Sequence, residues 1–197
     1  MKCSDDTDVA FVVDTSGSIS DENFVKQKDF IKVLASAFDP SIEDHQLGLI
    51  SYSSDAQVEV SFRDKADAAQ FESAVDRVPH TKGRTRLDKA LALAATQMFS
   101  TSGGTRSGKR KIMVILTDGR QSQDPDTIPL QEAVSPLRKL GVRVYTVAIG
   151  DEVDLNELYQ VTEGKDDVFP VSDFANLANM ATDIASKTCK VKAFRGK

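Results

Sequence analysis

Short apolar runs alternate with longer amphipathic segments along this chain. Apolar runs rich in β-branched residues occur at 8–14, 46–53, 111–118 and 142–150, and runs of this length and composition favour buried strands. Apolar residues at helical spacing predict helices at 22–38, 65–78, 87–99, 127–140, 154–162 and 174–187. Pro136 is expected to break the fourth of these helices into two pieces.

Two further segments complete the predicted sheet. Residues 56–62 alternate in polarity and follow the preceding strand after a tight turn, so we expect an antiparallel edge strand. Residues 167–171 form a last short strand. The predicted fold class is α/β: a doubly wound, mostly parallel central sheet of about six strands, one of them an antiparallel edge strand, with helices on both faces. Without repeats or linkers, residues 1–197 are predicted to form a single domain, with its core at about 8–188 and short tails.

Composition and charge narrow the class of protein. The 197 residues are 40% hydrophobic and 28% charged, as in an ordinary globular protein, and the net charge of −5 argues against nucleic-acid binding. No apolar run approaches the roughly 20 residues of a membrane span. The first residues lack the hydrophobic core of a secretory signal, which leaves a mature fragment, a recombinant piece or a cytosolic protein as interpretations.

The two cysteines lie just outside the periodic elements. Cys3 precedes the first strand and Cys189 follows the last helical pattern. We expect a disulfide between them that ties the tails together, with two unrelated free thiols as the alternative. Such a bridge indicates an oxidising, extracellular setting.

Two of the predicted strands end in an aspartate. Asp14 ends the first strand and is followed by Ser16 and Ser18, and Asp118 ends the fourth. In a doubly wound sheet, ligands bind beyond the carboxyl ends of the strands where the strand order reverses, so we expect the two acids to converge there. Carboxylate and hydroxyl oxygens are ligands for hard cations such as Mg²⁺ and Ca²⁺. Taken singly, each residue could instead be a turn or helix-capping residue.

A threonine in a Gly-Arg-Thr-Arg loop completes a known pattern. Together with residues 14–18 (Asp-Thr-Ser-Gly-Ser) it resembles the metal-ion-dependent adhesion site (MIDAS) of von Willebrand factor type A (vWA) domains, the family of integrin I domains, matrilins and the collagen VI globular domains. The resemblance covers nearly all of residues 8–188. It implies five metal ligands: Asp14, Ser16, Ser18, Thr85 and Asp118.

The chain departs from the family beside the threonine. The family usually carries Gly-x-Thr-x-Thr-Gly-x-Ala-Leu, whereas residues 83–91 read Gly-Arg-Thr-Arg-Leu-Asp-Lys-Ala-Leu. Leu87 and Asp88 therefore stand where a Thr-Gly pair is usual. The ligand threonine is retained, and the shape of the loop is expected to differ.

The resemblance implies an extracellular, metal-dependent adhesion module. Mg²⁺ is the expected ion, with Mn²⁺ or Ca²⁺ as alternatives, because Mg²⁺ tolerates an incomplete protein cage and retains waters. A shell with few direct anions leaves the ion able to bind a Glu or Asp of a matrix or cell-surface protein, for which a collagen-like protein is a candidate. Other domains of a larger parent protein are expected, and neither nucleic acid nor direct membrane insertion is.

Basic residues occur in the loops expected around this edge of the sheet. They would steer an acidic partner toward the metal, with ordinary solvated loop charge as the alternative. These candidate rim residues are His80, Lys82, Arg84, Arg86 and Arg120. A second basic cluster at 105–111 is expected at the opposite edge, as a solubility feature.

Two other classes of function compete with adhesion. One is a structural assembly domain whose contacts do not need the metal, and partner binding that survives EDTA would favour it. The other is a metal-dependent hydrolase, against which the chain has no second acid next to Asp14 and no Walker lysine loop, and its two histidines, His45 and His80, stand in unrelated loops. We therefore expect no enzyme. A bridge at Cys189 would restrain movement of the last helix, so a rigid module is expected.

Overall fold

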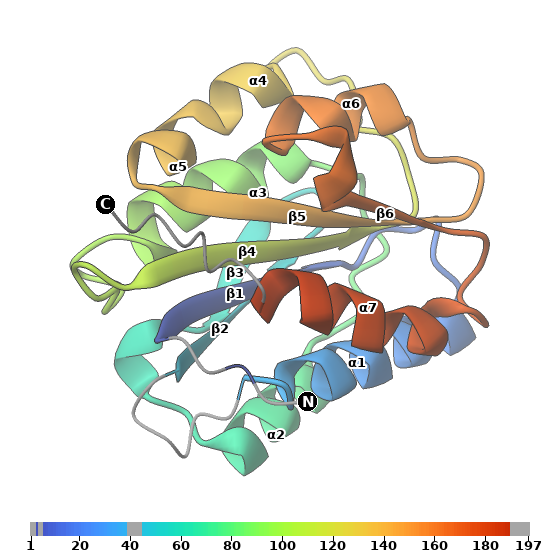
Figure 1. The fold of residues 1–197 in the computed structure, drawn as a ribbon. Helices are drawn as coiled ribbons and strands as arrows, with labels where there is room; N and C mark the ends of the chain where they lie inside the picture. The colour runs from blue at the N-terminus through green and yellow to red at the C-terminus, as the bar shows by residue number, and fades with distance from the viewer. Residues whose placement is uncertain (1–2, 4–5, 39–44, 190–197) are drawn as a thin grey trace.

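β1 lies near the middle of a six-stranded sheet with the strand order β3-β2-β1-β4-β5-β6 (Figure 1). The computed structural model describes residues 3, 6–38 and 45–189. Its strands are β1 (Thr7–Asp14), β2 (His45–Tyr52), β3 (Ala56–Val60), β4 (Arg110–Thr117), β5 (Val142–Ile149) and β6 (Val168–Val171). All pairs are parallel except β2 with the edge strand β3. The predicted fold class is confirmed.

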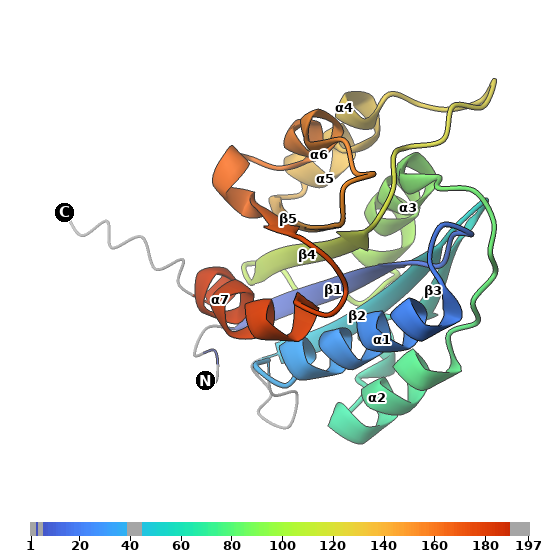
Figure 2. The same ribbon diagram turned by 90° about the vertical axis from the view of Figure 1, so that its right-hand side faces the viewer.

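Helices cover both faces of this sheet (Figure 2). One face carries α1 (Asp21–Ala35), α2 (Ala68–Arg77) and α7 (Leu177–Cys189), and the other carries α3 (Leu87–Leu93), α4 (Leu130–Ala133), α5 (Ser135–Lys139) and α6 (Leu155–Val161). A π-helical turn, Ala94–Met98, continues α3, and single 3₁₀ turns occur at Phe62–Asp64 and Lys165–Asp167. No helix in the described ranges is long and apolar enough to cross a membrane.

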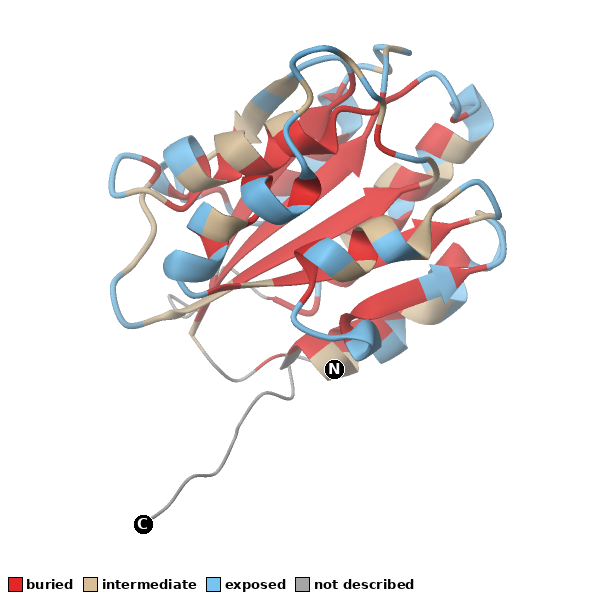
Figure 3. Ribbon diagram, turned by 90° about the horizontal axis from the view of Figure 1, so that it is seen from above, coloured by how far each residue is buried: buried red, intermediate tan, exposed pale blue. Residues whose placement is uncertain are grey.

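The strands in the middle of the sheet are apolar because both of their faces are covered (Figure 3). Phe11 and Val13 of β1 pack in the core under α1, α2 and α7, whereas Ala10 and Val12 pack in the core under α3 to α6. All four side chains are buried. This alternation explains why the first strand has a continuous apolar run instead of an alternating one.

Helix ends differ from the predicted ranges where capping decides them. α2 begins at Ala68 instead of 65, because Asp67 caps it: its carboxylate accepts from the backbone N–H of Gln70 at 2.8 Å, and its own N–H donates back to the Gln70 side chain at 3.0 Å. The predicted break at Pro136 is confirmed, since α4 ends at Ala133 and α5 begins with this proline in its first turn.

The strand order reverses between β1 and β4. From β1 the chain continues to β2 on one side, and β4 pairs with β1 on the other. Loops leaving the carboxyl ends of β1 and β4 therefore diverge at this point, which is where ligands bind in such sheets. Val13 is in register with Leu116, so the ends of the two strands are level with each other.

The basic cluster at 105–111 lies at the opposite edge of the sheet, beside the start of β1, as predicted. The interpretation of this cluster as a solubility feature was incomplete. Asp8 has no exposed surface, and its carboxylate accepts from the backbone N–H of Arg106 at 2.7 Å and from the Arg106 Nε at 2.8 Å. Arg106 thus pairs with a buried acid. Leaving that acid buried without a partner would cost free energy of folding.

Cys3 is buried with 6% of its surface exposed, and its backbone N–H donates to the Ala37 carbonyl at 2.9 Å. The side chain of Cys189 lies outside the described residues. The Cys3–Cys189 disulfide therefore stays a prediction, as does the single domain over residues 1–197.

We expect the variant Cys3→Ser to lower the free energy of unfolding by about 2–5 kcal/mol, because it would open a bridge that constrains the unfolded chain. Urea unfolding of this variant, of Cys189→Ser and of the unchanged protein measures the effect. The two single variants should lose equal stability. Two reactive thiols in the denatured, non-reduced protein would rule the bridge out.

Candidate metal centre

Asp14 is the last residue of β1, and its carboxylate is held from three sides. Its Oδ1 accepts from the backbone N–H of Ser16 at 2.8 Å. Its Oδ2 accepts from the Thr117 Oγ1 at 2.9 Å and from the Tyr52 hydroxyl at 3.3 Å. Thr117 and Tyr52 end the strands on either side of β1. The sheet itself therefore orients this carboxylate.

The two serines after β1 connect Asp14 to the end of β4. The hydroxyls of Ser16 and Ser18 are 3.0 Å apart, and the Ser18 hydroxyl donates to Asp118 Oδ1 at 2.7 Å. The glycine between the serines allows a close approach, because a Cβ at Gly17 would lie 3.0 Å from the carbonyl oxygen of Lys82. This contact places the serine loop against the loop that leads to Thr85.

Thr85 reaches the same place from the loop before α3. A Cβ built on Gly119, the residue after Asp118, would lie 3.7 Å from both the Thr85 Oγ1 and the Ser18 Oγ. The two hydroxyls therefore flank the same stretch of backbone. The structure thus brings all five predicted ligand positions to the carboxyl edge of β1 and β4.

These donors are three hydroxyls and two carboxylates. Oxygen-only sets of this kind suit hard cations such as Mg²⁺ and Ca²⁺. Nowhere in the described part of the chain do three His, Cys, Asp or Glu side chains gather in a way that could hold a metal ion. The edge of the sheet is a candidate of a different kind, because three of its five donor side chains are hydroxyls.

Burial shapes the electrostatics of the two acids. It raises the pKa of Asp14 from 3.8 to about 6, although hydrogen bonds from Ser16 and Thr117 favour the ionised form, and the nearby Asp118 raises it further. Burial also raises the pKa of Asp118, against the hydrogen bond from Ser18. A cation between these acids would favour their ionised forms.

The residues predicted from the sequence did not include Gln27 and Thr117, which hold the site. Gln27 of α1 has no exposed surface, and its Nε2 donates to the Asp14 carbonyl at 2.8 Å. Thr117 donates to the Asp14 carboxylate. Gln27 did leave a signal, since it stands three residues after Phe24 and four before Ile31, within the apolar face of that helix.

His80 forms part of the wall of the site and is not a free charge at its rim. Its Nδ1 lies 2.8 Å from the Asp21 carboxylate, and its Nε2 lies 3.1 Å from the Ser16 carbonyl oxygen. The ring stacks on Phe24, with the ring centroids 4.5 Å apart. These contacts connect α1, the serine loop and the loop before Thr85.

Three of the predicted rim residues are exposed. The side chains of Lys82 and Arg84 are 57% and 56% exposed, although each pairs with an aspartate at 2.9 Å, Lys82 with Asp21 and Arg84 with Asp124. Arg120, two residues after Asp118, is also exposed. These three side chains remain candidates for contact with a partner.

The prediction that Arg86 lies at the rim was wrong. Its side chain is only 4% exposed, and its guanidinium is paired with Asp88 and Asp126, each at 2.8 Å. The sequence placed it correctly beside Thr85 but could not show that acids from a distant loop surround it.

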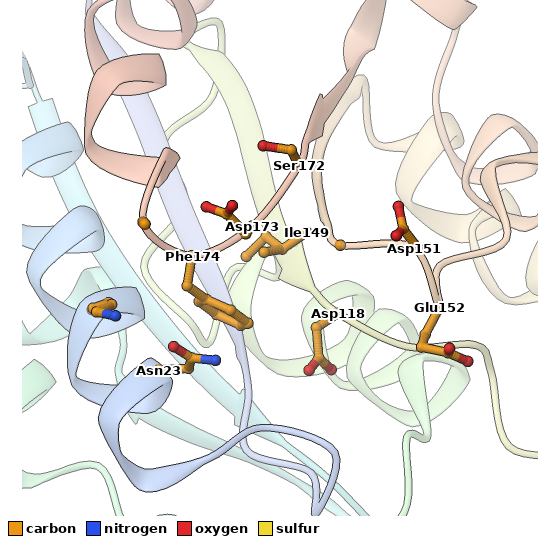
Figure 4. A pocket seen from close by; sticks show the side chains of 11 residues that line it. Asn23, Asp118, Ile149, Asp151, Glu152, Ser172, Asp173 and Phe174 are labelled. Carbon is orange, nitrogen blue, oxygen red and sulfur yellow. The ribbon is translucent and has the colours of Figure 1, made fainter.

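A hollow of about 300 Å³ adjoins Asp118 (Figure 4). It lies between α1, the loop after β5 and the loop after β6. Carboxylates and two apolar side chains line much of it: Asp118, Asp151, Glu152, Asp173, Ile149 and Phe174. Lys26 also lines the hollow, but it pairs with Glu22 at 2.8 Å. The hollow is therefore acidic, whereas the exposed rim residues on the other loops are basic.

The family model of the von Willebrand factor type A domain matches residues 8–183. This chain belongs to that family. The predicted resemblance is confirmed.

Curated relatives are matrix and adhesion proteins. The collagen alpha-6(VI) chain of Mus musculus is 30% identical over 182 residues, which cover 92% of this chain and 8% of that protein. Vitrin of Mus musculus is 32% identical over 191 residues, covering 95% of this chain and 28% of that protein. The human integrin alpha-D is 26% identical over 191 residues, covering 94% and 16%. The chain spans less than a third of the length of these relatives. The segment that these relatives share with this chain is a vWA domain.

Solved structures of similar fold include proximal thread matrix protein 1 (PTMP1) from the mussel byssus. The TM-score is 0.89 at 23% identity, over 95% of this chain and 49% of that one. A second structure of PTMP1, with a zinc-occupied MIDAS motif, has a TM-score of 0.88 at 22% identity, over 95% and 49%. At this identity the likeness shows the fold.

Proposed function

We propose that this domain binds an acidic side chain of a matrix or cell-surface protein through a divalent cation. The observation that carries the proposal is the convergence of the five oxygen donors at one edge of the sheet. The ligands would be Asp14, Ser16, Ser18, Thr85 and Asp118.

Mg²⁺ is the ion we assign to this site. The donors are all oxygen, and Mg²⁺ keeps several waters when the protein supplies few ligands. Zinc occupies the MIDAS motif in one structure of the mussel protein, but zinc prefers nitrogen and sulfur ligands, which are absent from these five residues. Mn²⁺ and Ca²⁺ are the alternatives, and an oxygen-only shell accommodates both.

The partner would complete the coordination of the ion with a Glu or Asp. With two carboxylates in the shell, the ion retains Lewis acidity toward a third. The exposed Lys82, Arg84 and Arg120 would attract an acidic segment and speed its approach. The hollow beside Asp118 is acidic. It would therefore favour a partner segment that carries basic residues on that side. A collagen-like protein is a candidate for such a partner.

Catalysis is not part of the proposal. The hydroxyl of Ser18 donates to Asp118, a carboxylate that the proposal assigns to the metal, and neither ring nitrogen of His80 faces a serine hydroxyl within the described contacts. A serine nucleophile needs a base within hydrogen-bond reach. The site therefore supports binding.

Binding to a panel of collagens and matrix proteins, in Mg²⁺, Ca²⁺ or EDTA, tests the proposal. We expect at least one protein of the panel to bind in Mg²⁺, and EDTA to abolish that binding, because the ion is the link between the two proteins. Asp14→Ala should abolish it as well. Asp166→Ala, a change of equal charge at an exposed position away from the site, serves as the matched control and should bind normally.

The outcome separates adhesion from assembly. Binding that survives both EDTA and Asp14→Ala would refute the metal link and favour a structural assembly domain whose contacts lie elsewhere.

A further inference from the structure

We propose that the buried pair of Arg86 and Asp88 fixes the loop that carries Thr85 to the loop that follows Asp118, so that the metal site is held in one arrangement. Arg86 and Asp88 are positioning residues in this role, since neither is among the proposed ligands. The inference rests on the proposed function and concerns how that site is held.

The pair itself has the geometry of a two-pronged contact. The Nε of Arg86 donates to Asp88 Oδ1 at 2.9 Å, and its NH2 group donates to Asp88 Oδ2 at 2.8 Å. The two side chains are 4% and 1% exposed. A planar guanidinium held by two parallel bonds and shielded from water has little freedom to move.

Arg86 then reaches across to the loop after β4. Its NH1 group donates to Asp126 Oδ1 at 2.8 Å and to Asp124 Oδ2 at 3.4 Å. Both aspartates lie in the segment 119–128, which begins directly after the ligand Asp118. A single side chain therefore spans the two loops.

Asp88 and Gln121 close the same connection from the other side. Asp88 accepts from the backbone N–H of Ile128 at 3.1 Å and from the Gln121 Nε2 at 2.5 Å. The Gln121 Oε1 accepts from the backbone N–H of Leu87 at 2.8 Å. Both ends of segment 119–128 are thus bound to the start of α3.

The proposed ligand Thr85 depends directly on this junction. Its backbone N–H donates to the Ser122 Oγ at 3.0 Å, and its carbonyl accepts from the backbone N–H of Ser122 at 2.8 Å. Arg86 is the next residue along the chain. Movement of segment 119–128 would therefore move the backbone of Thr85.

One residue of the junction, Asp88, stands at a position where this chain departs from its family. Where the family usually has glycine, the chain has Asp88, and a glycine offers no carboxylate to a neighbouring arginine. The charge is stable as well: burial would raise the pKa of Asp88, but the hydrogen bonds from Arg86, Ile128 and Gln121 lower it to about 2. The junction therefore stays ionised at every pH at which the domain would work.

The double variant Arg86→Met/Asp88→Asn tests the proposal without leaving one buried charge unpaired. We expect its Mg²⁺ dissociation constant, measured by calorimetry, to rise by about 10–100-fold, as for residues that orient metal ligands. In EDTA, hydrogen exchange at the amides of Thr85 and Ser122 should accelerate at least tenfold. Arg86→Lys, which keeps the charge but not the fork, should fall between the two proteins.

The matched control is Lys89→Met/Asp55→Asn. This ion pair also involves α3 and is joined at 3.0 Å, but Asp55 is 90% exposed. The control should leave both the Mg²⁺ affinity and the exchange of Thr85 unchanged.

A lower melting temperature of Arg86→Met/Asp88→Asn with unchanged Mg²⁺ affinity and unchanged exchange at Thr85 would overturn the proposal, since the pair would then be merely structural. If the unchanged protein bound no Mg²⁺, the proposed function would fail. The exchange measurement in EDTA would still decide whether the pair fixes the Thr85 loop.

Discussion

Asp14→Asn should make the metal-free domain more stable and at the same time abolish its response to Mg²⁺. The carboxylate of Asp14 is fully buried, and its pKa is raised to about 6 from 3.8. Ionised Asp14 therefore costs the folded, metal-free protein about 3 kcal/mol above pH 6. An amide of the same shape removes that cost, and the hydroxyls of Thr117 and Tyr52 can rotate to accept from it.

Thermal and urea unfolding at pH 7.5, in EDTA and in Mg²⁺, measure this effect. The unchanged protein should gain stability from Mg²⁺, and Asp14→Asn should not. Asp166→Asn, an exposed change of equal charge, should behave as the unchanged protein does. An Asp14→Asn variant less stable than the unchanged protein in EDTA would show that the buried carboxylate is not a source of strain.

Acidification should weaken Mg²⁺ binding and stabilise the metal-free domain in the same pH range. A ligand carboxylate must be ionised to bind the ion, so protons compete with Mg²⁺ below the pKa of about 6. From pH 7.5 to pH 5 the Mg²⁺ dissociation constant should rise about tenfold, because the ionised fraction of Asp14 falls by about that factor.

The raised pKa of Asp14 also determines how the stability of the metal-free protein changes with pH. Between about pH 4 and pH 6 the folded state holds a proton on Asp14 that the unfolded state has lost. Stability of the metal-free protein therefore rises as the pH falls through this window, by about 1.4 kcal/mol at pH 5 relative to pH 7.5. Subtracting the same curve for Asp14→Asn removes the contribution of other groups. Equal Mg²⁺ affinity at pH 5 and pH 7.5 would contradict the assignment of Asp14 as a ligand.

The strands and the ligand positions could be predicted because one physical pattern specifies both. A strand buried on two faces must be apolar, so an acid at its end marks the point where the chain leaves the sheet. Asp14 and Asp118 stood at two such ends. Their convergence then followed from the general position of sites in doubly wound sheets.

Pairing between distant loops could not be predicted in the same way. Arg86 stands beside a ligand and before a helix, and nothing in those neighbours shows that Asp124 and Asp126 surround it. Asp8 gave a similar difficulty, because its partner Arg106 lies 98 residues further along the chain. Buried ion pairs depend on which loops meet, whereas hydrophobic periodicity reports only on the local element.

The pairing of β1 with β4 affects how this domain folds during synthesis. The residues in register on these two strands, such as Thr7 and Arg110, are separated by most of the chain. Contacts of such long range are slow to form, because the chain must lose the entropy of closing a large loop before these contacts stabilise it. During synthesis β1 is thus left with an unpaired, apolar edge until residue 117 is available. A shortened chain that ends before β4 would present that edge to its neighbours and should aggregate.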